Sequence, residues 1–379
     1  MTGAAAARPR VAFGALGPDY RSKRQAIDAA IARVLSRGCF VLGEEVRAFE
    51  EAFAKFLGVE HVVGCASGTE AIALALQAAG LSRGDEVLLP ANTCVPTLAG
   101  VRLAGGQPRL ADVDPKTLTL DAENAARALS LATRFLLPVH LYGGLADLDG
   151  LAALAAERRL TLVEDCAQSH GALLRGRAAG SFGAAAAFSF YPSKNLGAYG
   201  DAGAVATNDA ALAGRLRELR QYGWSRRDVA EREGWNSRLD ELQAAILSAK
   251  LPSLAAENAR RRTIAARYDA ALAGLPLRRV EFRSGSVPSR HIYPVLLPGR
   301  DAFREHLLAR GVETGVHYPV PLHLQPAYSF LGGRPGDFPV AEEACSTEVS
   351  LPIHPALSDS DVETVIAAAR SFFDAGAGR

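Results

Sequence analysis

The chain lacks an excess of either charge, and this absence narrows the classes of partner. Its 379 residues carry 42 Lys and Arg against 41 Asp and Glu, and the resulting net charge is +1. The two signs are interspersed, so no basic face is evident that would favour nucleic acid or an anionic membrane surface. Small molecules and other proteins remain as partners.

Long apolar runs and paired cysteines are missing as well. No run reaches the ~18 apolar residues of a membrane span, and the start MTGAAAARPRVAF has no positive region followed by an apolar core. The five cysteines are odd in number, widely spaced and without a C-x-x-C pair, so they suggest neither a disulfide framework nor a zinc site. We therefore expect a soluble, cytoplasmic protein with no metal site.

Short apolar runs alternate with helical patterns through the first half of the chain. The runs that predict strands begin at His61, Glu86, Gln107, Arg134, Leu160, Ala185 and Ala202. Helix-length segments such as GTEAIALALQAAG separate most of them, which is the pattern of a mostly parallel sheet covered on both faces. With 49% hydrophobic residues the chain can bury large cores, and its length favours about two domains.

The second half predicts a smaller domain. The pattern turns helical from about residue 209 to 267, and then gives a strand in HIYPVLL, a helix in DAFREHLLARG, a proline-rich loop and a last helix from about Ser358. We predict an α/β protein with a large domain of residues 1–250, built on a seven-stranded sheet between helices. A smaller α+β domain of residues 251–379 follows it.

The motif SGTEA follows the first predicted strand and has two interpretations. Ser67 and Glu70 have the spacing of a capping box, so the motif is typical of a well-capped helix. The same helix start offers free N–H groups at Gly68 and Thr69, and these donors suit a phosphate. The motif alone does not decide between them.

Two further strand ends carry a carboxylate and a lysine. Asp165 lies in VEDCAQSHGA, and Lys194 follows 194 − 165 = 29 residues later in FSFYPSKNLGAYGDAGAV. Taken singly, Asp165 is typical of a helix cap or turn, and Lys194 of a surface lysine. Ligands of open α/β sheets bind beyond the carboxyl ends of the strands. Pyridoxal phosphate (PLP) needs a lysine for its aldehyde, a carboxylate for its ring nitrogen and an anion site for its phosphate.

Four motifs together resemble one family. GCASGTEAIALAL, VEDCAQSHGA, FSFYPSKNLGAYGDAGA and GWNSRLDELQAAIL occur in the order of the DegT/DnrJ/StrS sugar aminotransferases, and the likeness extends from FVLGEEVRAFEEAFAKFLG to SLPIHPALSD. The resemblance implies the aspartate-aminotransferase fold, which is PLP fold type I. It also implies that Lys194 holds PLP as a Schiff base and that Asp165 pairs with the pyridinium nitrogen, keeping the ring an electron sink.

The resemblance assigns the other cofactor contacts position by position. Gln168 matches the glutamine near the phenolic oxygen of the ring, and Ser189 matches the hydroxyl that joins Gly68 and Thr69 on the phosphate. Asn236 matches an asparagine that reaches the phosphate from the neighbouring subunit, which implies a homodimer with shared sites. Without the family, Asn236 is typical of a helix N-cap before a helix from Ser237.

One position departs from the family pattern. Many relatives carry an aromatic residue after the second strand to stack on the ring, whereas the aligned residue in PANTCVPTLAGV is Cys94. Sulfur packs on a ring with less contact area, so the stacking role of Cys94 is open. Arg238 lies where a carboxylate or phosphate of the substrate would be met.

The reaction implied is transamination of a nucleotide-linked ketosugar, with L-glutamate as the amino donor. VHLYGG and TGVHYPVPLHLQPAY look most like members that aminate C-3, so we predict a dTDP-linked 3-keto-6-deoxyhexose. His317, Tyr318 and His323 are expected to donate to its diphosphate. Gly144 departs from the glutamine of many C-3 relatives. The alternatives are amination at C-4, a sugar dehydratase, which would replace Lys194 by histidine, and a non-catalytic sensor or scaffold of the same fold.

Overall fold

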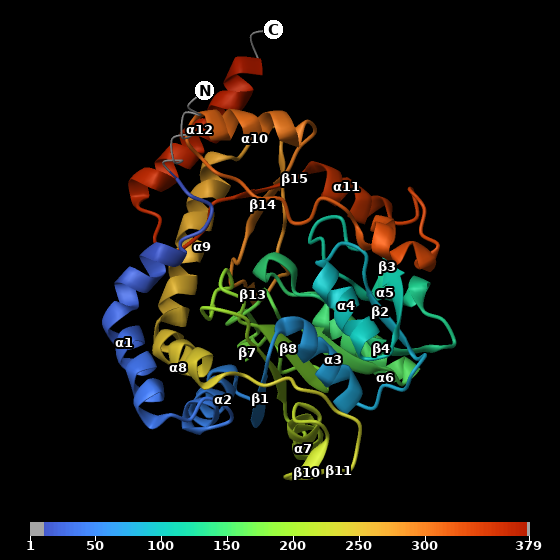
Figure 1. The fold of residues 1–379 in the computed structure, drawn as a ribbon. Coiled ribbons are helices and arrows are strands. Elements are labelled where there is room, and N and C mark those ends of the chain that lie inside the picture. Colours follow the sequence, from blue (N-terminus) through green and yellow to red (C-terminus); the bar gives the residue numbers. More distant parts are fainter. Residues whose placement is uncertain (1–10, 377–379) are drawn as a thin grey trace, which may run out of the picture.

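A computed structural model of the protein describes residues 11–376. A seven-stranded sheet forms its centre, with the C-terminal part of the chain above it and helix α1 along one side (Figure 1). The strands of this sheet run in the order β1-β9-β8-β5-β4-β2-β3. In chain order they are β1 His61–Cys65, β2 Glu86–Pro90, β3 Gln107–Ala111, β4 Thr133–Leu136, β5 Thr161–Asp165, β8 Ala185–Ser189 and β9 Gly203–Thr207.

The mostly parallel α/β sheet that the sequence predicted is confirmed. Strands β8, β5, β4, β2 and β3 pair in parallel, and β9 is antiparallel to both of its neighbours, β1 and β8. Strand β1 therefore points the same way as β8. All seven predicted runs form strands, and the carboxyl ends of six of them gather at one edge of the sheet.

Helices cover both faces because the strands are apolar on both sides. Helices α3 (Gly68–Ala78), α4 (Val95–Leu103) and α7 (Ala210–Leu219) pack on one face. The other face packs against α2 (Glu44–Leu57) and α8 (Glu241–Lys250), and its far part against α5 and α6, residues Ala122–Ala128 and Leu148–Arg158. Helix α1 (Leu16–Arg37) lies on α8.

The C-terminal part has its own core, built around the three-stranded sheet β12-β14-β15. Its elements are β12 Arg278–Arg279, β14 Tyr293–Leu296, β15 Glu348–Leu351, α9 Leu254–Ala271, α10 Arg300–Ala309, α11 Pro339–Thr347 and α12 Asp359–Gly376. The 3-10 turns η1 Leu141–Gly143, η2 Leu251–Ser253, η3 Leu322–Leu324 and η4 Pro326–Leu331 complete the helical segments. The division into residues 1–250 and 251–379 stays a prediction.

Short strands outside the sheet were not expected from the sequence. The stretch predicted as helical contains a hairpin of β10 (Trp224–Arg226) and β11 (Val229–Ala230), and β6, β7 and β13 form a second small sheet at Leu173–Leu174, Arg177–Ala178 and Ser286–Val287. Two- and three-residue strands carry too little periodicity to be recognised. No helix among residues 11–376 is long and apolar enough to span a bilayer.

Candidate active site

The site lies at the edge of the sheet where parallel strands end. Asp165 is the last residue of β5 and Ser189 the last of β8, while Ser67 and Cys94 follow β1 and β2 by a few residues. Because these strands are parallel, their carboxyl ends share one edge, where ligands of α/β sheets bind. The fold therefore brings together residues that lie far apart in the sequence.

Asp165 is buried and held by two donors. Its Oδ2 accepts a hydrogen bond from Thr97 Oγ1 at 2.9 Å, and its Oδ1 accepts one from the Ala167 N–H at 3.0 Å. Thr97 in turn lies 3.0 Å from the Thr93 hydroxyl. Burial raises the pKa of Asp165, because a carboxylate loses hydration there. Thr97 was missed in the sequence, where it is one of many threonines in a first helical turn.

Lys194 lies in the loop after β8 and is partly exposed. Its backbone N–H donates to the Tyr191 carbonyl at 2.8 Å. Burial lowers the pKa of Lys194, while the charge of Asp165 acts in the opposite direction. Gly197 closes this loop, and any Cβ there would lie 2.3 Å from the Pro192 carbonyl oxygen. The glycine is therefore required by the loop that presents the lysine.

The start of α3 forms a cradle beside Ser189. Ser67 is the N-cap, and its hydroxyl accepts from the Glu70 N–H at 3.2 Å, so the capped helix expected from the sequence is present. The first N–H groups of a helix have no intrahelical acceptor, which leaves those of Gly68 and Thr69 for a ligand. A Cβ at Gly68 would lie 2.5 Å from the Ser189 Cβ. The glycine lets the helix start approach the serine hydroxyl.

Gln168 connects the strand-end loops to the loop of His317 and Tyr318. Its Oε1 accepts from the Tyr142 N–H at 2.7 Å, and its Nε2 donates to the Tyr318 hydroxyl at 2.9 Å. An amide nitrogen carries two hydrogens, so one N–H of Gln168 remains for a ligand. Tyr318 also contacts Cys94, and burial raises the pKa of the Cys94 thiol. Cys94 is therefore present as a thiol and not as a reactive thiolate.

A cavity of about 340 Å³ opens next to Lys194. Its lining includes Lys194, His291, His317 and Phe13, the last from the segment before α1. Burial lowers the pKa of His317 to about 4, so the imidazole is neutral at neutral pH. Asp165 and the cradle at α3 do not line this cavity, although the charges of Asp165 and Lys194 interact.

The third residue predicted in this loop, His323, lies in a different environment. It is 2% exposed, its Nε2 lies 3.0 Å from Glu342 Oε1, and its ring packs edge-on against Phe338. His323 is not among the residues that line the cavity. A contact between His323 and the substrate stays a prediction.

Asn236 and Arg238 lie on the surface segment before α8. The sequence left open that Asn236 caps a helix from Ser237, and this is wrong: α8 begins at Glu241 and its N-cap is Asp240. Asn236 instead forms an isolated β-bridge with Gln221 and is exposed. The Arg238 guanidinium lies 5.8 Å from the Tyr222 ring centre. Within residues 11–376, neither side chain forms a hydrogen bond with the strand-end loops, so a contact with the cofactor site of the same subunit is not seen.

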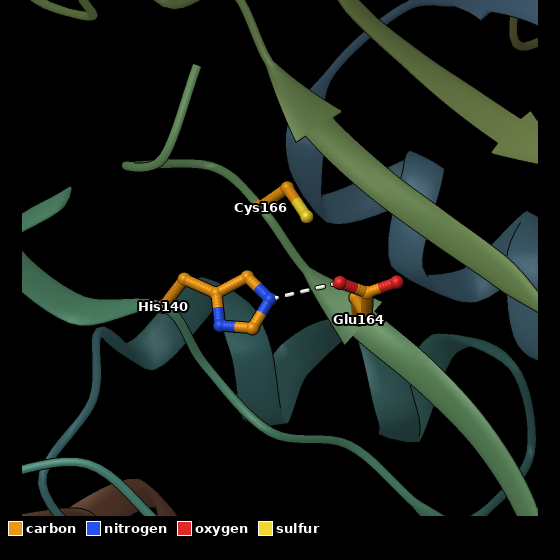
Figure 2. Close-up of side chains that lie close together, drawn as sticks. All are labelled: His140, Glu164 and Cys166. Atoms are coloured by element: carbon orange, nitrogen blue, oxygen red, sulfur yellow. Dashed lines mark hydrogen bonds and ion pairs between the residues drawn. The ribbon is translucent and has the colours of Figure 1, made fainter. Parts of the chain in front are cut away.

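Glu164 and Cys166, the neighbours of Asp165 in the sequence, form a buried cluster with His140 (Figure 2). The Glu164 carboxylate lies 3.0 Å from His140 Nε2 and also accepts from the N–H groups of Gly180, Phe182 and Gly183 at 2.8–2.9 Å. The other imidazole nitrogen of His140 accepts from the Ala146 N–H at 3.2 Å. Both imidazole nitrogens of His140 and both carboxylate oxygens of Glu164 already take part in hydrogen bonds, so we interpret this cluster as a structural clasp.

The residues present fit PLP on three observations. A lysine whose pKa burial lowers, a buried carboxylate with no cationic hydrogen-bond partner among the described residues, and a helix start with glycine beside a serine hydroxyl meet at one sheet edge. Groups of these three kinds are the ones that PLP needs for its aldehyde carbon, its ring nitrogen and its phosphate.

The chain matches the DegT/DnrJ/EryC1/StrS aminotransferase family over residues 21–370. It is 45% identical over 365 residues to a dTDP-3-amino-3,4,6-trideoxy-alpha-D-glucose transaminase of Streptomyces venezuelae, covering 96% of each chain. The crystal structure of S. venezuelae DesV in complex with a ketimine intermediate superposes with a TM-score of 0.94 at 45% identity, covering 96% of this chain and 98% of that one. NtdA of Bacillus subtilis with bound cofactor PMP superposes with a TM-score of 0.89 at 29% identity, covering 98% and 86%.

Proposed function

We propose the substrate and the residue roles of this protein from one premise: the chain belongs to the DegT/DnrJ/EryC1/StrS aminotransferase family. It is a PLP-dependent sugar aminotransferase that acts on nucleotide-linked ketosugars. Our proposal is that the sugar is a dTDP-linked 3-keto-6-deoxyhexose, that the amine is placed at C-3, and that L-glutamate is the donor. The observation that carries it is the 45% identity to a transaminase named for a dTDP-3-amino sugar.

Lys194 is proposed to move the proton in both half-reactions. When bound, PLP supplies an electron sink that stabilises negative charge at the carbon next to the transferred nitrogen. The lowered pKa of Lys194 favours its neutral amine, which is the form that can act as nucleophile and base. As a free amine, Nζ would take the proton from Cα of glutamate in the first half-reaction. In the second half-reaction it would deliver a proton to C-3 of the sugar.

Asp165 and Gln168 are proposed to fix the orientation and charge of the ring. Asp165 would pair with the ring nitrogen, and its carboxylate is already oriented by Thr97 and Ala167. Gln168 would direct its remaining N–H at the phenolic oxygen. Gly68, Thr69 and Ser189 are proposed to bind the phosphate, because backbone donors at a helix start favour an anion.

The loop of His317 and Tyr318 is proposed to face the sugar. It contacts the residues proposed to bind the cofactor through the hydrogen bond between Tyr318 and Gln168.

Gly144 stands where many C-3 relatives have glutamine, and this difference has a physical reason: a Cβ at Gly144 would lie 2.4 Å from Phe282 Cδ1. Phe282 takes the space that a glutamine side chain would need, and the Arg290 guanidinium stacks on its ring at 4.1 Å.

Asn236 is proposed to complete the phosphate site of the second subunit in a homodimer. It is exposed and lies close in sequence to Arg238, whose guanidinium lies over the exposed ring of Tyr222. Exposed apolar groups beside a polar residue suit an interface between subunits. Arg238 would then meet the substrate carboxylate or phosphate from the same segment.

The experiment compares two ketosugars under one set of conditions. Enzyme, PLP and glutamate are incubated with matched 3-keto and 4-keto dTDP-6-deoxyhexoses, and NMR locates the new amine. We expect the 3-keto sugar to be aminated at C-3 and Lys194→Ala to give no product. Amination of the 4-keto sugar alone would overturn the C-3 proposal and leave the aminotransferase intact. No turnover of any ketosugar in a panel, together with no glutamate-dependent change in the cofactor absorbance, would favour the non-catalytic sensor.

A further inference from the structure

His317 is held by a chain of polar groups on β15. Its Nδ1 lies 2.8 Å from Ser350 Oγ, and its backbone N–H donates to Glu348 Oε2 at 2.7 Å. The Ser350 hydroxyl donates to the other carboxylate oxygen, Oε1. Glu348 and Ser350 are two positions apart on one strand, so their side chains lie on the same face, toward the His317 loop. Both are fully buried.

The His317 ring is also fixed from its other sides. Phe13 stacks on it with ring centres 5.6 Å apart, and Tyr142 Oη donates to the His317 carbonyl at 2.7 Å. Gly315 pairs with Ser350 on β15, and a Cβ at Gly315 would lie 2.7 Å from His317 Cε1. The ring therefore has one orientation, with Nδ1 toward β15 and an edge on the cavity beside Lys194.

Proton counting then assigns the tautomer. An ionised carboxylate only accepts, so it takes both the His317 N–H and the single hydroxyl hydrogen of Ser350. With its hydrogen given to Glu348, Ser350 Oγ can only accept from His317 Nδ1. A neutral imidazole carries one hydrogen, so Nε2 is left with a lone pair.

We propose that Glu348 and Ser350 are positioning residues that hold His317 as the Nδ1–H tautomer, so that Nε2 accepts a hydrogen bond from a hydroxyl group of the ketosugar. The choice of a hydroxyl rests on the proposed function, since it supplies a sugar in this cavity. A diphosphate oxygen has no hydrogen to offer and would meet a lone pair. This proposal differs from the prediction made from the sequence, in which His317 donates to the diphosphate.

Glu348→Gln reverses the chain with almost no change in shape. The glutamine oxygen still accepts the His317 N–H, which places its NH₂ group at the position of Oε1. That group donates to Ser350 Oγ, so the Ser350 hydrogen turns to Nδ1 and the imidazole becomes the Nε2–H tautomer. Ser350→Thr keeps the hydroxyl, Ser350→Ala removes it, and Ser346→Ala on exposed surface is the matched control.

The first measurement needs no sugar. Two-bond ¹H–¹⁵N correlation spectra of the ¹⁵N-histidine-labelled holoenzyme at pH 8 report which imidazole nitrogen carries the hydrogen, and His317→Asn assigns the signal. We expect Nδ1–H in the wild type, in Ser350→Thr and in Ser346→Ala, and Nε2–H in Glu348→Gln. Nε2–H in the wild type, or an unchanged tautomer in Glu348→Gln, would overturn the positioning role. If Glu348→Gln does not fold, Ser350→Ala decides, because loss of the acceptor should abolish the Nδ1–H preference.

The second measurement separates sugar binding from chemistry. Losing one hydrogen bond costs roughly a factor of ten in affinity. We expect KM for the ketosugar to rise about tenfold in Glu348→Gln and Ser350→Ala, with kcat and the glutamate half-reaction within about threefold of the wild type. A switched tautomer with unchanged KM would overturn the hydroxyl contact alone. Failure of the wild type to aminate any ketosugar would refute the proposed function, and the spectra would still decide the tautomer.

A pH profile gives an independent check. Burial raises the pKa of Glu348 to about 7, although the positive charges of Arg300 and Arg304 on α10 act to lower it. The other titratable groups around it, Tyr142, Cys345 and His317, stay neutral near that pH. Protonated Glu348 would donate to Ser350 as glutamine does, so KM for the sugar should rise as the pH falls from 8 to 6. The same profile in Glu348→Gln should be flat, and a parallel rise there would contradict the assignment.

Discussion

Replacing Asp165 with Asn should separate catalysis from stability. The side chain keeps its shape: its oxygen can accept from the Ala167 N–H, and its NH₂ group can donate to Thr97 Oγ1. Thr97 can then turn its hydrogen to Thr93, 3.0 Å away. Every buried polar group keeps a partner, so the substitution removes a charge and leaves the hydrogen-bond network complete.

The two expected effects differ in sign and size. Burial raises the folded-state pKa of Asp165, so the native state binds its proton more tightly than the unfolded state does. Its contribution to stability is therefore lost as the pH rises through that pKa, and at pH 7 the cofactor-free Asn variant should be as stable as the wild type or more stable. The ring nitrogen, in contrast, loses its charged partner, and such losses cost ~2.7–4 kcal/mol of barrier, or about 10²–10³ in rate.

The assay combines urea unfolding of the cofactor-free protein with single-turnover kinetics of the glutamate half-reaction. Thr97→Val is the matched control, because it removes the ~1 kcal/mol hydrogen bond to Asp165, together with the contact to Thr93, and keeps the charge, so its rate should fall by no more than about tenfold. A loss below tenfold in Asp165→Asn, or a loss equal to that of Thr97→Val, would refute a role for the charge. Strong destabilisation of the Asn variant would contradict the expectation that every buried polar group keeps a hydrogen-bond partner.

Three further predictions concern the lysine, the dimer and the clasp. Lys194→Ala should abolish turnover and the visible absorbance of the lysine-bound cofactor; repeated turnovers in this variant would show that another group acts as the base. Lys194→Ala and Asn236→Asp subunits mixed in equal amounts should recover up to about a quarter of the wild-type activity, because about half of the dimers are hybrids and one of the two sites in each hybrid holds both intact residues. No recovery despite proven subunit exchange would place Asn236 outside the shared site. Glu164→Gln should lower the free energy of unfolding by about 3 kcal/mol, since an amide cannot accept from three backbone N–H groups and His140; a loss below about 1 kcal/mol in urea unfolding would contradict the clasp.

The sheet and its functional edge were predictable because both depend on local patterns. Apolar runs separated by helical segments predict parallel strands, and parallel strands place Asp165, Ser189 and the start of α3 at one edge. Ser67 follows the capping rule as expected from its spacing to Glu70. The roles of these residues are predicted by the family resemblance and stay to be tested.

Contacts between distant segments were not predictable. Thr97 reaches Asp165 across 68 positions, and Ser350 reaches His317 across 33, with no local rule that links them. The alternative that a helix starts at Ser237 is wrong as well, because α8 begins only at Glu241. Propensity does not determine where a helix starts when backbone pairing such as the bridge between Asn236 and Gln221 competes.

Glu164 and Asp165 show how one strand end serves two purposes. Neighbouring residues of a strand point to opposite faces, so Asp165 turns toward α4 and Thr97 while Glu164 turns away from them. There Glu164 accepts from N–H groups of the loop before β8, and thereby ties the strand that carries Ser189 to the strand that carries Asp165. Its contact with His140 is drawn in Figure 2. Asp165 lies at the sheet edge that is proposed to hold PLP, and Glu164 points to the opposite face of the sheet. Asp165→Asn should therefore lower the rate without lowering the free energy of unfolding. Glu164→Gln should lower the stability of the fold and have a smaller effect on the rate, because the spacing between the two strand ends depends on a fully buried side chain.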